Sequence, residues 1–270
     1  MKYGLIAGNG RFPILALEEA RKLGHEVVVV AIKEEAWKEV ETLAARCYWI
    51  SLGELGKLIG ILHSEGITEV VMAGQVKHAS IFSSIRPDWR LFKLLASLKE
   101  KNTDALIFGV VRILEEEGIR LLDSTALLKP LLAGEGTLTR RQPTSDEERD
   151  IAYGRRVANA LAAYDIGQSV AICERACVAV EAMEGTDAML RRAASLVNGR
   201  RLTLVKVSRR RGHLLFDVPV AGVDTIAVMK ETGTSAMAVD AGRTLLLDRE
   251  EMLRRADEAG LCVTGCRPEE

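Results

Sequence analysis

The chain has 270 residues, which suits either one large domain or two domains of ordinary size. Hydrophobic residues make up 48% and charged residues 28%, so the chain can bury a core and is not an intrinsically disordered protein. The formal net charge of -1 and an aromatic content of only 4% argue against a nucleic-acid-binding protein, because such proteins usually need a basic surface and base-stacking aromatics.

The cysteines form an odd and scattered set of five: Cys47, Cys173, Cys177, Cys262 and Cys266. Two pairs share a C-x-x-x-C spacing without a histidine cluster, so we expect reduced thiols in a cytoplasmic protein rather than disulfides or a zinc site. The first residues predict a strand and lack the apolar core of a signal peptide. No apolar run approaches the roughly 18 residues that span a bilayer, which leaves contact with a membrane surface open.

The first half alternates strand and helix patterns. Short apolar, β-branched runs predict strands at 3–8, 26–32, 48–50, 69–73 and 120–122. Helical apolar spacing predicts helices at 13–24, 36–45, 52–63, 89–99 and 104–117. This alternation is typical of βαβ units on a parallel sheet. We therefore expect an α/β protein of two domains, with a Rossmann-like N-terminal domain over residues 1–130.

The first predicted strand ends in a glycine turn, Gly8-Asn9-Gly10, which begins like a dinucleotide G-x-G-x-x-G fingerprint. Pro13 replaces the third glycine, which normally lets helix and strand pack closely, and it suits the first turn of a helix instead. The sequence of this turn favours binding of another nucleotide or a phosphate over NAD. A plain tight turn that binds no ligand explains the two glycines nearly as well.

A second turn follows the strand at 69–73. Lys77 lies there, at the end of a strand where open α/β sheets bind ligands. Its ammonium group could meet a phosphate, or it is a solvated surface lysine.

The run from Ile81 to Leu95 mixes bulky apolar and basic residues, and holds two of the five phenylalanines and one of the three tryptophans. Such a mixture could line an acyl-chain groove or touch a membrane surface. A helix that packs on the core of its own domain is the commoner explanation, and the two do not exclude each other.

The second half is predicted as a linker over residues 131–145 and a mixed α/β catalytic domain over 146–270. Ser145 and Glu148 have capping-box spacing for a helix to 163, and Asp224 stands where a helix N-cap belongs. Strands are expected at 169–174, 177–183, 202–207, 214–216, 236–239 and 244–247, and further helices at 188–197, from Gly222 to Glu231, and at 249–259. The sequence does not give the order of these strands.

The stretch Val178–Arg192 predicts a strand, an acidic glycine turn and a helix start. Unpaired N–H groups at such a start can bind phosphate oxygens, and Glu181, Glu184 and Asp187 would suit a divalent cation. A capped helix with solvated acids is the alternative. Asp165 and Gln168, which precede this region, could orient groups at a site or satisfy their own turn.

Asp217 stands where a predicted strand stops, just before Pro219 and after three arginines. An acid at that place can ligate a metal or accept a proton from water. The alternative is a loop aspartate with local backbone bonds.

Several runs together resemble one enzyme family. In order, they are Asp165-Ile-Gly-Gln168, Glu181-Ala-Met-Glu-Gly-Thr-Asp-Ala-Met189, Phe216-Asp-Val-Pro219 followed by Gly222 and Thr225, and Asp240-Ala-Gly-Arg-Thr-Leu-Leu-Leu-Asp248. With the turns at Gly8 and Gly74, they resemble UDP-2,3-diacylglucosamine pyrophosphatases of the LpxI type, from lipid A biosynthesis. The resemblance covers nearly the whole chain.

The resemblance implies a two-domain cytoplasmic enzyme that binds a lipid-linked nucleotide in the cleft between its domains. It implies Mg²⁺-dependent hydrolysis of UDP-2,3-diacylglucosamine to UMP and 2,3-diacylglucosamine 1-phosphate (lipid X), with the key acid at Asp217. Peripheral contact with the inner membrane and a homodimer are left open. Leu215, where the family commonly has a polar or charged residue, departs from the pattern, so Lys206 or an arginine of 209–211 would contact phosphate instead.

The site expected from these considerations spans both domains. Asp217 is the predicted catalytic residue, and the metal ligands are predicted to be Asp217, Glu184 and Asp187. Substrate contacts are predicted from Gly8, Asn9, Gly10, Lys77, Gln168, Thr186 and Lys206. The alternatives from other classes are a non-catalytic nucleotide-sugar-binding regulator, which the concentration of acids disfavours, and a nicotinamide-dependent oxidoreductase, which Pro13 disfavours.

Overall fold

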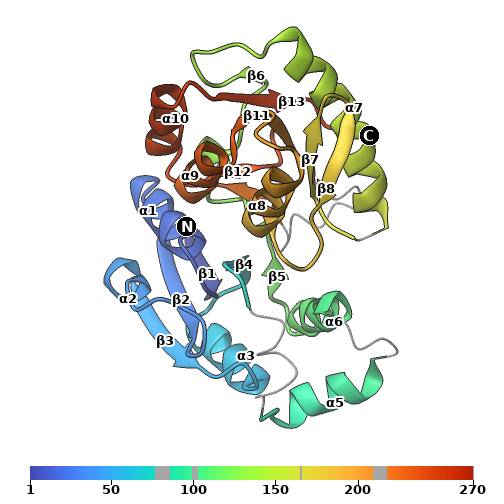
Figure 1. The fold of residues 1–270 in the computed structure, drawn as a ribbon. Coiled ribbons are helices and arrows are strands. Elements are labelled where there is room, and N and C mark those ends of the chain that lie inside the picture. The colour runs from blue at the N-terminus through green and yellow to red at the C-terminus, as the bar shows by residue number, and fades with distance from the viewer. Residues whose placement is uncertain (77–85, 99–102, 165, 209–217, 270) are drawn as a thin grey trace. The chain divides into compact units, whose positions relative to one another are not determined.

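The structure, a computed structural model, describes residues 1–76, 86–98, 103–164, 166–208 and 218–269 (Figure 1). The chain divides into two compact units, Met1–Leu128 and Lys129–Glu270. Each unit has its own sheet, and each is described by itself below.

The first unit is built on a five-stranded sheet in which every pairing is parallel. Its order is β3-β2-β1-β4-β5, with β1 (Lys2–Ala7), β2 (Glu26–Ile32), β3 (Arg46–Ile50), β4 (Glu69–Ala73) and β5 (Arg120–Leu121). This is the strand order of a Rossmann-like sheet, whose direction of winding reverses between β1 and β4. The predicted parallel N-terminal sheet is confirmed.

Helices of the first unit are α1 (Phe12–Lys22), α2 (Val40–Leu43), α3 (Leu55–Ser64), α5 (Trp89–Ser97) and α6 (Thr103–Glu116). Pro13 lies in the first turn of α1, as predicted. The helix predicted at 36–45 is wrong in length. The N–H groups of Glu35 and Ala36 both bond to the carbonyl of Ile32, so the chain turns there and becomes helical only at Val40.

The second unit is built on a mixed six-stranded sheet in the order β6-β13-β11-β9-β7-β8. Its strands are β6 (Gly136–Thr137), β7 (Ser169–Cys173), β8 (Ala176–Val180), β9 (Leu202–Lys206), β11 (Thr234–Asp240) and β13 (Cys262–Cys266). β9, β11 and β13 are parallel, whereas β6, β7 and β8 pair antiparallel with their neighbours. The predicted mixed C-terminal sheet is confirmed, and β10 (Val220–Ala221) pairs with β12 (Leu245–Leu246) separately.

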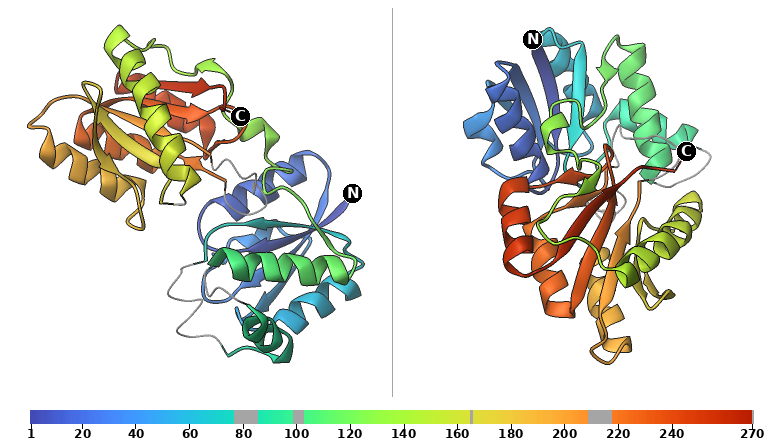
Figure 2. Two further views of the ribbon diagram at one scale, coloured as in Figure 1. Left: turned by 90° about the vertical axis from the view of Figure 1, so that its right-hand side faces the viewer. Right: turned by 90° about the horizontal axis from the view of Figure 1, so that it is seen from above.

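Helices cover both faces of this second sheet (Figures 1 and 2). Apolar side chains from α8 (Thr186–Leu196), α9 (Val223–Thr232) and α10 (Arg249–Glu258) share one core cluster with alternate strand residues such as Ala171 and Leu204. α7 (Ser145–Ala163) packs on the opposite face, where Ile172 and Val205 point. Across the described helices, including the short 3₁₀ turn Lys129–Leu131, none is both long and apolar enough to cross a membrane.

Three sequence predictions in this unit need correction. The capping box of α7 uses Thr144 and Glu147, one residue earlier than predicted, because Glu147 is buried and held by Arg141 and Ser235. Gly222 rather than Asp224 is the N-cap of α9.

The third correction concerns β13, which the sequence reading missed. Only two of its five residues, Val263 and Thr264, are β-branched, and the run includes Gly265, where a Cβ would lie 1.8 Å from the Gly134 carbonyl oxygen. The same contact brings part of the predicted linker against the sheet, where β6 pairs with β13.

Candidate functional site

Polar side chains gather at one edge of the second sheet, where its parallel strands end. β9 ends at Lys206 and β11 at Asp240. The antiparallel neighbour β7 begins at this edge, so Ser169 lies directly opposite Lys206. β8 ends here as well, and the backbone N–H of Glu181 donates to the Ser169 carbonyl at 2.9 Å. The carboxyl ends of strands are where open α/β sheets bind ligands.

Four of these side chains form what we call the lysine–hydroxyl cluster: Ser169, Glu181, Thr186 and Lys206. The Lys206 ammonium donates to Thr186 Oγ1 at 2.9 Å and to Ser169 Oγ at 3.4 Å. The two hydroxyl oxygens lie 3.2 Å apart, and Thr186 donates its proton to Glu181 Oε1 at 3.0 Å. The cluster therefore links a cation to a carboxylate through a shared hydroxyl group.

Charge in this cluster is not balanced by direct pairing. Lys206 is only 8% exposed, yet among the residues that the structure describes no carboxylate oxygen lies within ion-pair distance of its ammonium. Glu181 Oε2 is buried and has no hydrogen-bond partner within that part of the chain. A buried ion without a direct counter-charge is costly, so the arrangement suits an external anion on Lys206 and a cation on Glu181.

The turn from Glu181 to Gly185 delivers Thr186 to this edge. Gly185 is the N-cap of α8 and has φ +84°, a conformation that glycine adopts without strain. Since glycine offers no capping oxygen, the first N–H groups of α8 remain available at the positive end of the helix dipole. The predicted strand, glycine turn and helix start are thus present.

Glu184, a predicted metal ligand, faces another partner. Its Oε2 accepts from the Ala182 N–H at 2.9 Å, and its Oε1 from the Arg192 guanidinium at 2.5 Å. Hydrogen bonds from its own N–H and from Arg192 lower the pKa of this carboxyl. Glu184 would have to leave these contacts to bind a metal, and its assignment stays a prediction.

Asp187 lies one residue beyond Thr186 on α8. Burial raises the pKa of its carboxyl above the usual value, and the negative charges of Asp224 and Glu181 add to the rise. Arg191 and Lys206 act in the opposite direction. The carboxylates of Asp224 and Glu181 therefore repel that of Asp187 at the start of α8, and a divalent cation would relieve this repulsion.

The residues present fit a cation, although its ligand set is incomplete in the described part of the chain. There, no group of three histidine, cysteine, aspartate or glutamate side chains is placed to hold a metal ion. Asp217, the predicted catalytic residue and third ligand, lies outside the described residues, as do Lys77 and Asp165. The unpartnered oxygen of Glu181 and the raised pKa of Asp187 are the observations that favour a cation here.

The chain is anchored on both sides of residues 209–217. Asp240, 2% exposed, accepts from the Ser208 N–H at 2.8 Å and hydroxyl at 2.9 Å, and its other oxygen accepts from Arg155 at 2.9 Å. On the far side, the Pro219 carbonyl accepts from the Leu245 N–H at 2.9 Å. Buried, hydrogen-bonded pairs of this kind fix geometry more than they add stability.

Gly8, Asn9 and Gly10 lie at the carboxyl edge of the other sheet, where β1 adjoins β4. The Gly8 N–H donates to the Ala73 carbonyl at 2.8 Å, and Asn9 exchanges two backbone hydrogen bonds with Gln75, at 2.7 and 3.0 Å. A Cβ at Gly8 would lie 2.6 Å from the Gln75 oxygen. Gly8 therefore lets two loops of the protein approach each other, and its N–H and that of Asn9 are already engaged.

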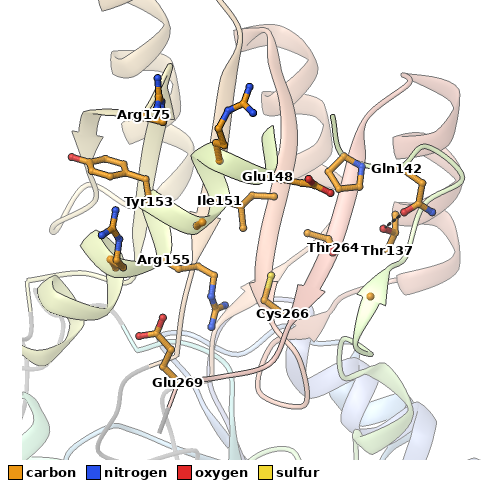
Figure 3. Close-up of a pocket in the computed structure, with 15 residues that line it drawn as sticks. Thr137, Gln142, Glu148, Ile151, Tyr153, Arg155, Arg175, Thr264, Cys266 and Glu269 are labelled. Carbon is orange, nitrogen blue, oxygen red and sulfur yellow. Dashed lines mark hydrogen bonds between the residues drawn. The ribbon is translucent and has the colours of Figure 1, made fainter. Parts of the chain in front are cut away.

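A pocket of about 890 Å³ lies elsewhere in the second unit (Figure 3). It is lined by Ile151 and Arg155 of α7, by Thr137 of β6, and by Thr264 and Cys266 of β13, together with neighbouring residues. No predicted site residue is among those that line it. The candidate site is therefore defined by the lysine–hydroxyl cluster rather than by this pocket.

The structure adds residues that the sequence reading did not select. Ser169 joins the cluster only because β7 runs antiparallel to β9, an arrangement that no local pattern reveals. Glu181, one of the three acids of the predicted turn but not one of the predicted site residues, accepts a hydrogen bond from Thr186 directly. Gln168 is adjacent, since its carbonyl accepts from the Val207 N–H at 2.9 Å.

Two solved structures that the chain resembles are remote likenesses. The biotin carboxylase domain of Hydrogenobacter thermophilus 2-oxoglutarate carboxylase is 14% identical, with a TM-score of 0.28, over 64% of this chain and 35% of that one. UDP-glucose-4-epimerase from Stenotrophomonas maltophila is 13% identical, with a TM-score of 0.30, over 44% of this chain and 34% of that one. The chain thus matches about a third of each, and nothing about its function follows from them.

Sequence comparison is far more specific. Residues 2–131 match the family model of the LpxI N-terminal domain, and residues 134–264 match that of the LpxI C-terminal domain. A curated protein of Caulobacter vibrioides, named UDP-2,3-diacylglucosamine pyrophosphatase LpxI, is 34% identical over an alignment of 279 positions that covers 100% of this chain and 99% of that protein. The chain therefore belongs to the LpxI family.

Proposed function

We propose that this protein hydrolyses the diphosphate of UDP-2,3-diacylglucosamine, releasing UMP and 2,3-diacylglucosamine 1-phosphate (lipid X). Family membership and the name of the Caulobacter vibrioides relative support the substrate. The observation that carries the chemistry is the buried Lys206 ammonium, which has no direct counter-charge among the described residues and lies beside a helix start and two acids.

Diphosphate hydrolysis requires charge neutralisation and positioning more than covalent work by the protein. A water oxygen forms a bond to one phosphorus, the bond from that phosphorus to the bridging oxygen breaks, and the bridging oxygen leaves on the other phosphate. Lys206 would bind a phosphate oxygen in place of a carboxylate counter-ion, and the Thr186 N–H would bind another. Glu181 orients Thr186 for this contact through its 3.0 Å hydrogen bond.

Mg²⁺ is proposed as the cofactor. Asp187 and Asp217 would hold it, with Glu184 if that side chain leaves Arg192, and Glu181 Oε2 lies in the same group of acids. The cation would neutralise charge on the diphosphate and increase the acidity of the attacking water. Mg²⁺ takes only one or two carboxylates and keeps several waters, so a complete cage of protein ligands is not required. Asp217 is also proposed to accept the proton of the attacking water.

The remaining substrate contacts are proposed from both units. Gln168 belongs to the edge that carries Lys206. Gly8, Asn9, Gly10 and Lys77 follow β1 and β4 of the first sheet. Because the N–H groups of Gly8 and Asn9 are engaged, Lys77 is the stronger of these candidates for a charged contact. We place the enzyme in the cytoplasm, where it would work at the inner membrane on a lipid substrate.

Mass spectrometry of the products tests this proposal. Purified protein incubated with UDP-2,3-diacylglucosamine and Mg²⁺ should release UMP and lipid X, and EDTA should stop the release. Asp217→Asn should lower the rate by about 100-fold or more while the protein stays folded, whereas Asp146→Asn, at an exposed acid of α7, should not. Binding without release of UMP would contradict the proposal and favour a nucleotide-sugar-binding regulator.

A further inference from the structure

Helix α5 is fixed to the first unit by one apolar face. Leu91 and Leu94 are 4% and 3% exposed, and Leu94 fills the space beside Gly109, where a Cβ would lie 2.4 Å from it. Asp88 caps the helix by accepting from the Leu91 N–H at 2.9 Å, and its other oxygen accepts from the Gly56 N–H at 2.6 Å. An ion pair between Arg90 and Glu117 ties the helix to the chain that follows α6. The helix is therefore held in one orientation.

The opposite face of α5 is also apolar, but nothing in the described chain covers it. Trp89 is 75% exposed and Phe92 is 52% exposed. Their rings stack with centroids 5.9 Å apart and planes 23° apart. Ala96, one turn beyond Phe92, is exposed on the same side. The large exposed aromatic side chains of the described chain are Trp37, Trp89, Phe92, Phe108 and Tyr164, and Trp89 and Phe92 lie together as a stacked pair.

Basic side chains flank this pair. Arg86 and Lys93 are exposed, and the structure gives neither an ion pair with any residue that it describes. Lys93 lies one residue beyond Phe92 and one turn from Trp89, at the edge of the apolar face. The whole chain carries a formal charge of -1, so attraction to an anionic surface would have to come from a local group of cations such as this one.

We propose that α5 docks on the surface of a bilayer that contains anionic lipids, with Trp89 and Phe92 at the level of the headgroups. Tryptophan is favoured at that depth because one end of its ring system is apolar and the other donates a hydrogen bond. Arg86 and Lys93 would meet lipid phosphates on either side, as in interfacial amphipathic helices. The proposal rests on the proposed function in one respect, since a diacyl substrate has to be taken from a membrane.

Arg86 and Lys93, which have no ion-pair partner among the described residues, favour this occupant over a second copy of the chain. A symmetric dimer built on this face would bring the basic residues of both copies into one interface, and like charges repel. An anionic bilayer would contact the apolar residues with its interior boundary and the basic residues with its phosphates. The rigid attachment of α5 also means that little conformational entropy is lost when the face is covered.

Co-sedimentation with vesicles tests the proposal. The full-length protein should bind vesicles of phosphatidylcholine mixed with phosphatidylglycerol, and less strongly vesicles of phosphatidylcholine alone. Trp89→Ser with Phe92→Ser should weaken binding to the mixed vesicles about tenfold or more. Arg86→Gln with Lys93→Gln should weaken it about fivefold for each charge removed, but only on the anionic vesicles.

Leu23→Ser is the matched control, because Leu23 is 54% exposed in the same unit but lies at the end of α1; it should bind as the wild type does. Equal binding by the Trp89/Phe92 variant would overturn the proposal. The proposal would also be overturned if analytical ultracentrifugation showed a wild-type dimer that the Trp89/Phe92 variant dissociates. The vesicles contain no substrate, so a protein that binds them but releases no UMP would contradict the proposed hydrolysis and leave the docking surface intact.

Discussion

The turn after β1 and the lysine–hydroxyl cluster both lie at the carboxyl ends of parallel strands, yet they differ in whether their polar groups have partners within the protein. In the turn, the N–H groups of Gly8 and Asn9 bond to the loop after β4, and the Asn9 side chain accepts from the Trp37 indole at 2.9 Å. In the cluster, the Lys206 ammonium is buried against hydroxyl groups, and one oxygen of Glu181 has no partner among the described residues.

This difference separates structural from functional use of the same position in a fold. A satisfied turn gains nothing in hydrogen bonding when a ligand arrives, because its donors must first leave their partners. A cluster whose buried charges are not directly paired becomes more stable when a ligand pairs with them. The glycine spacing at Gly8 and Gly10 thus marks a place where two loops touch, and the acidic turn from Glu181 to Gly185 is better supplied for ligand binding.

Lys206→Met is the most direct test of the difference between the turn after β1 and the lysine–hydroxyl cluster. Methionine keeps much of the length and apolar stem of lysine but removes the charge, so the rate of UMP release should fall by about 100-fold or more. The free energy of unfolding should stay level or rise, because a buried charge without a direct partner is replaced by an apolar group. Steady-state kinetics and urea denaturation, run on the same preparation, measure the two quantities.

A structural role for Lys206 would give the reverse pattern. The variant would then lose several kcal/mol of stability, by about the amount expected for breaking a buried pair, while the surviving folded protein kept its rate. Lys230→Met, at an exposed lysine of α9, is the matched control and should change neither measurement.

Gly8→Ala tests the other region. The added methyl group would lie 2.6 Å from the backbone oxygen of Gln75, which cannot rotate away as a side chain can. We expect a loss of about 1–3 kcal/mol in the free energy of unfolding, typical of overpacking. Gly60→Ala is the control, since Gly60 is exposed in α3 with nothing within 4 Å of an added Cβ, and it should gain up to about 1 kcal/mol. Equal effects of the two substitutions would show that the loops do not depend on this contact.

The sequence predicted most of the first sheet because its strands are apolar, β-branched and separated by helices, so that local pattern and tertiary role agree. The strand Glu69–Ala73 was placed to the residue, and the winding of a parallel sheet then followed from general rules. The second sheet was harder. Three central parallel strands are joined there to antiparallel strands on both sides, and β13 carries a glycine at a close backbone contact, which weakens its strand pattern.

The candidate site divides in the same way. Thr186 and Lys206 could be named from the sequence because a helix start and a strand end are local features. Ser169 could not, since it meets Lys206 only through the pairing of β7 with β9. The partnership of Glu184 with Arg192 is set by side-chain geometry on one turn of α8, which residue spacing alone does not resolve.

Glu181→Gln tests whether Glu181 serves a cation in the lysine–hydroxyl cluster or only positions Thr186. Glutamine can still accept the hydrogen bond from Thr186, which the structure places at 3.0 Å from Glu181 Oε1, but it removes the negative charge. If that charge serves a cation, the Mg²⁺ concentration for half-maximal rate should rise about tenfold, as for other groups that support a metal site. Glu231→Gln, at an exposed glutamate paired with Arg191, should leave the titration unchanged. A lower rate at every Mg²⁺ concentration, without a shift of the midpoint, would assign Glu181 to the positioning of Thr186 alone.

Asp187→Asn should change the free energy of unfolding only slightly, the smallest of the expected effects, and the sign of that change carries the information. Burial raises the pKa of Asp187 in the folded protein, with Asp224 and Glu181 acting in the same direction. The folded state therefore holds this proton more tightly than the unfolded chain, so the contribution of Asp187 to stability is full below the unfolded pKa and is lost as the pH rises through the folded pKa. In EDTA at neutral pH, Asp187→Asn should thus be slightly more stable than the wild type, and the gain should vanish in acid.

Mg²⁺ should reverse the order of stability of the two proteins, because a cation that binds only the folded state stabilises the wild type by mass action and the variant less. If Mg²⁺ raised the melting temperature of both proteins equally, Asp187 would be a buried acid beside the site and not a ligand within it.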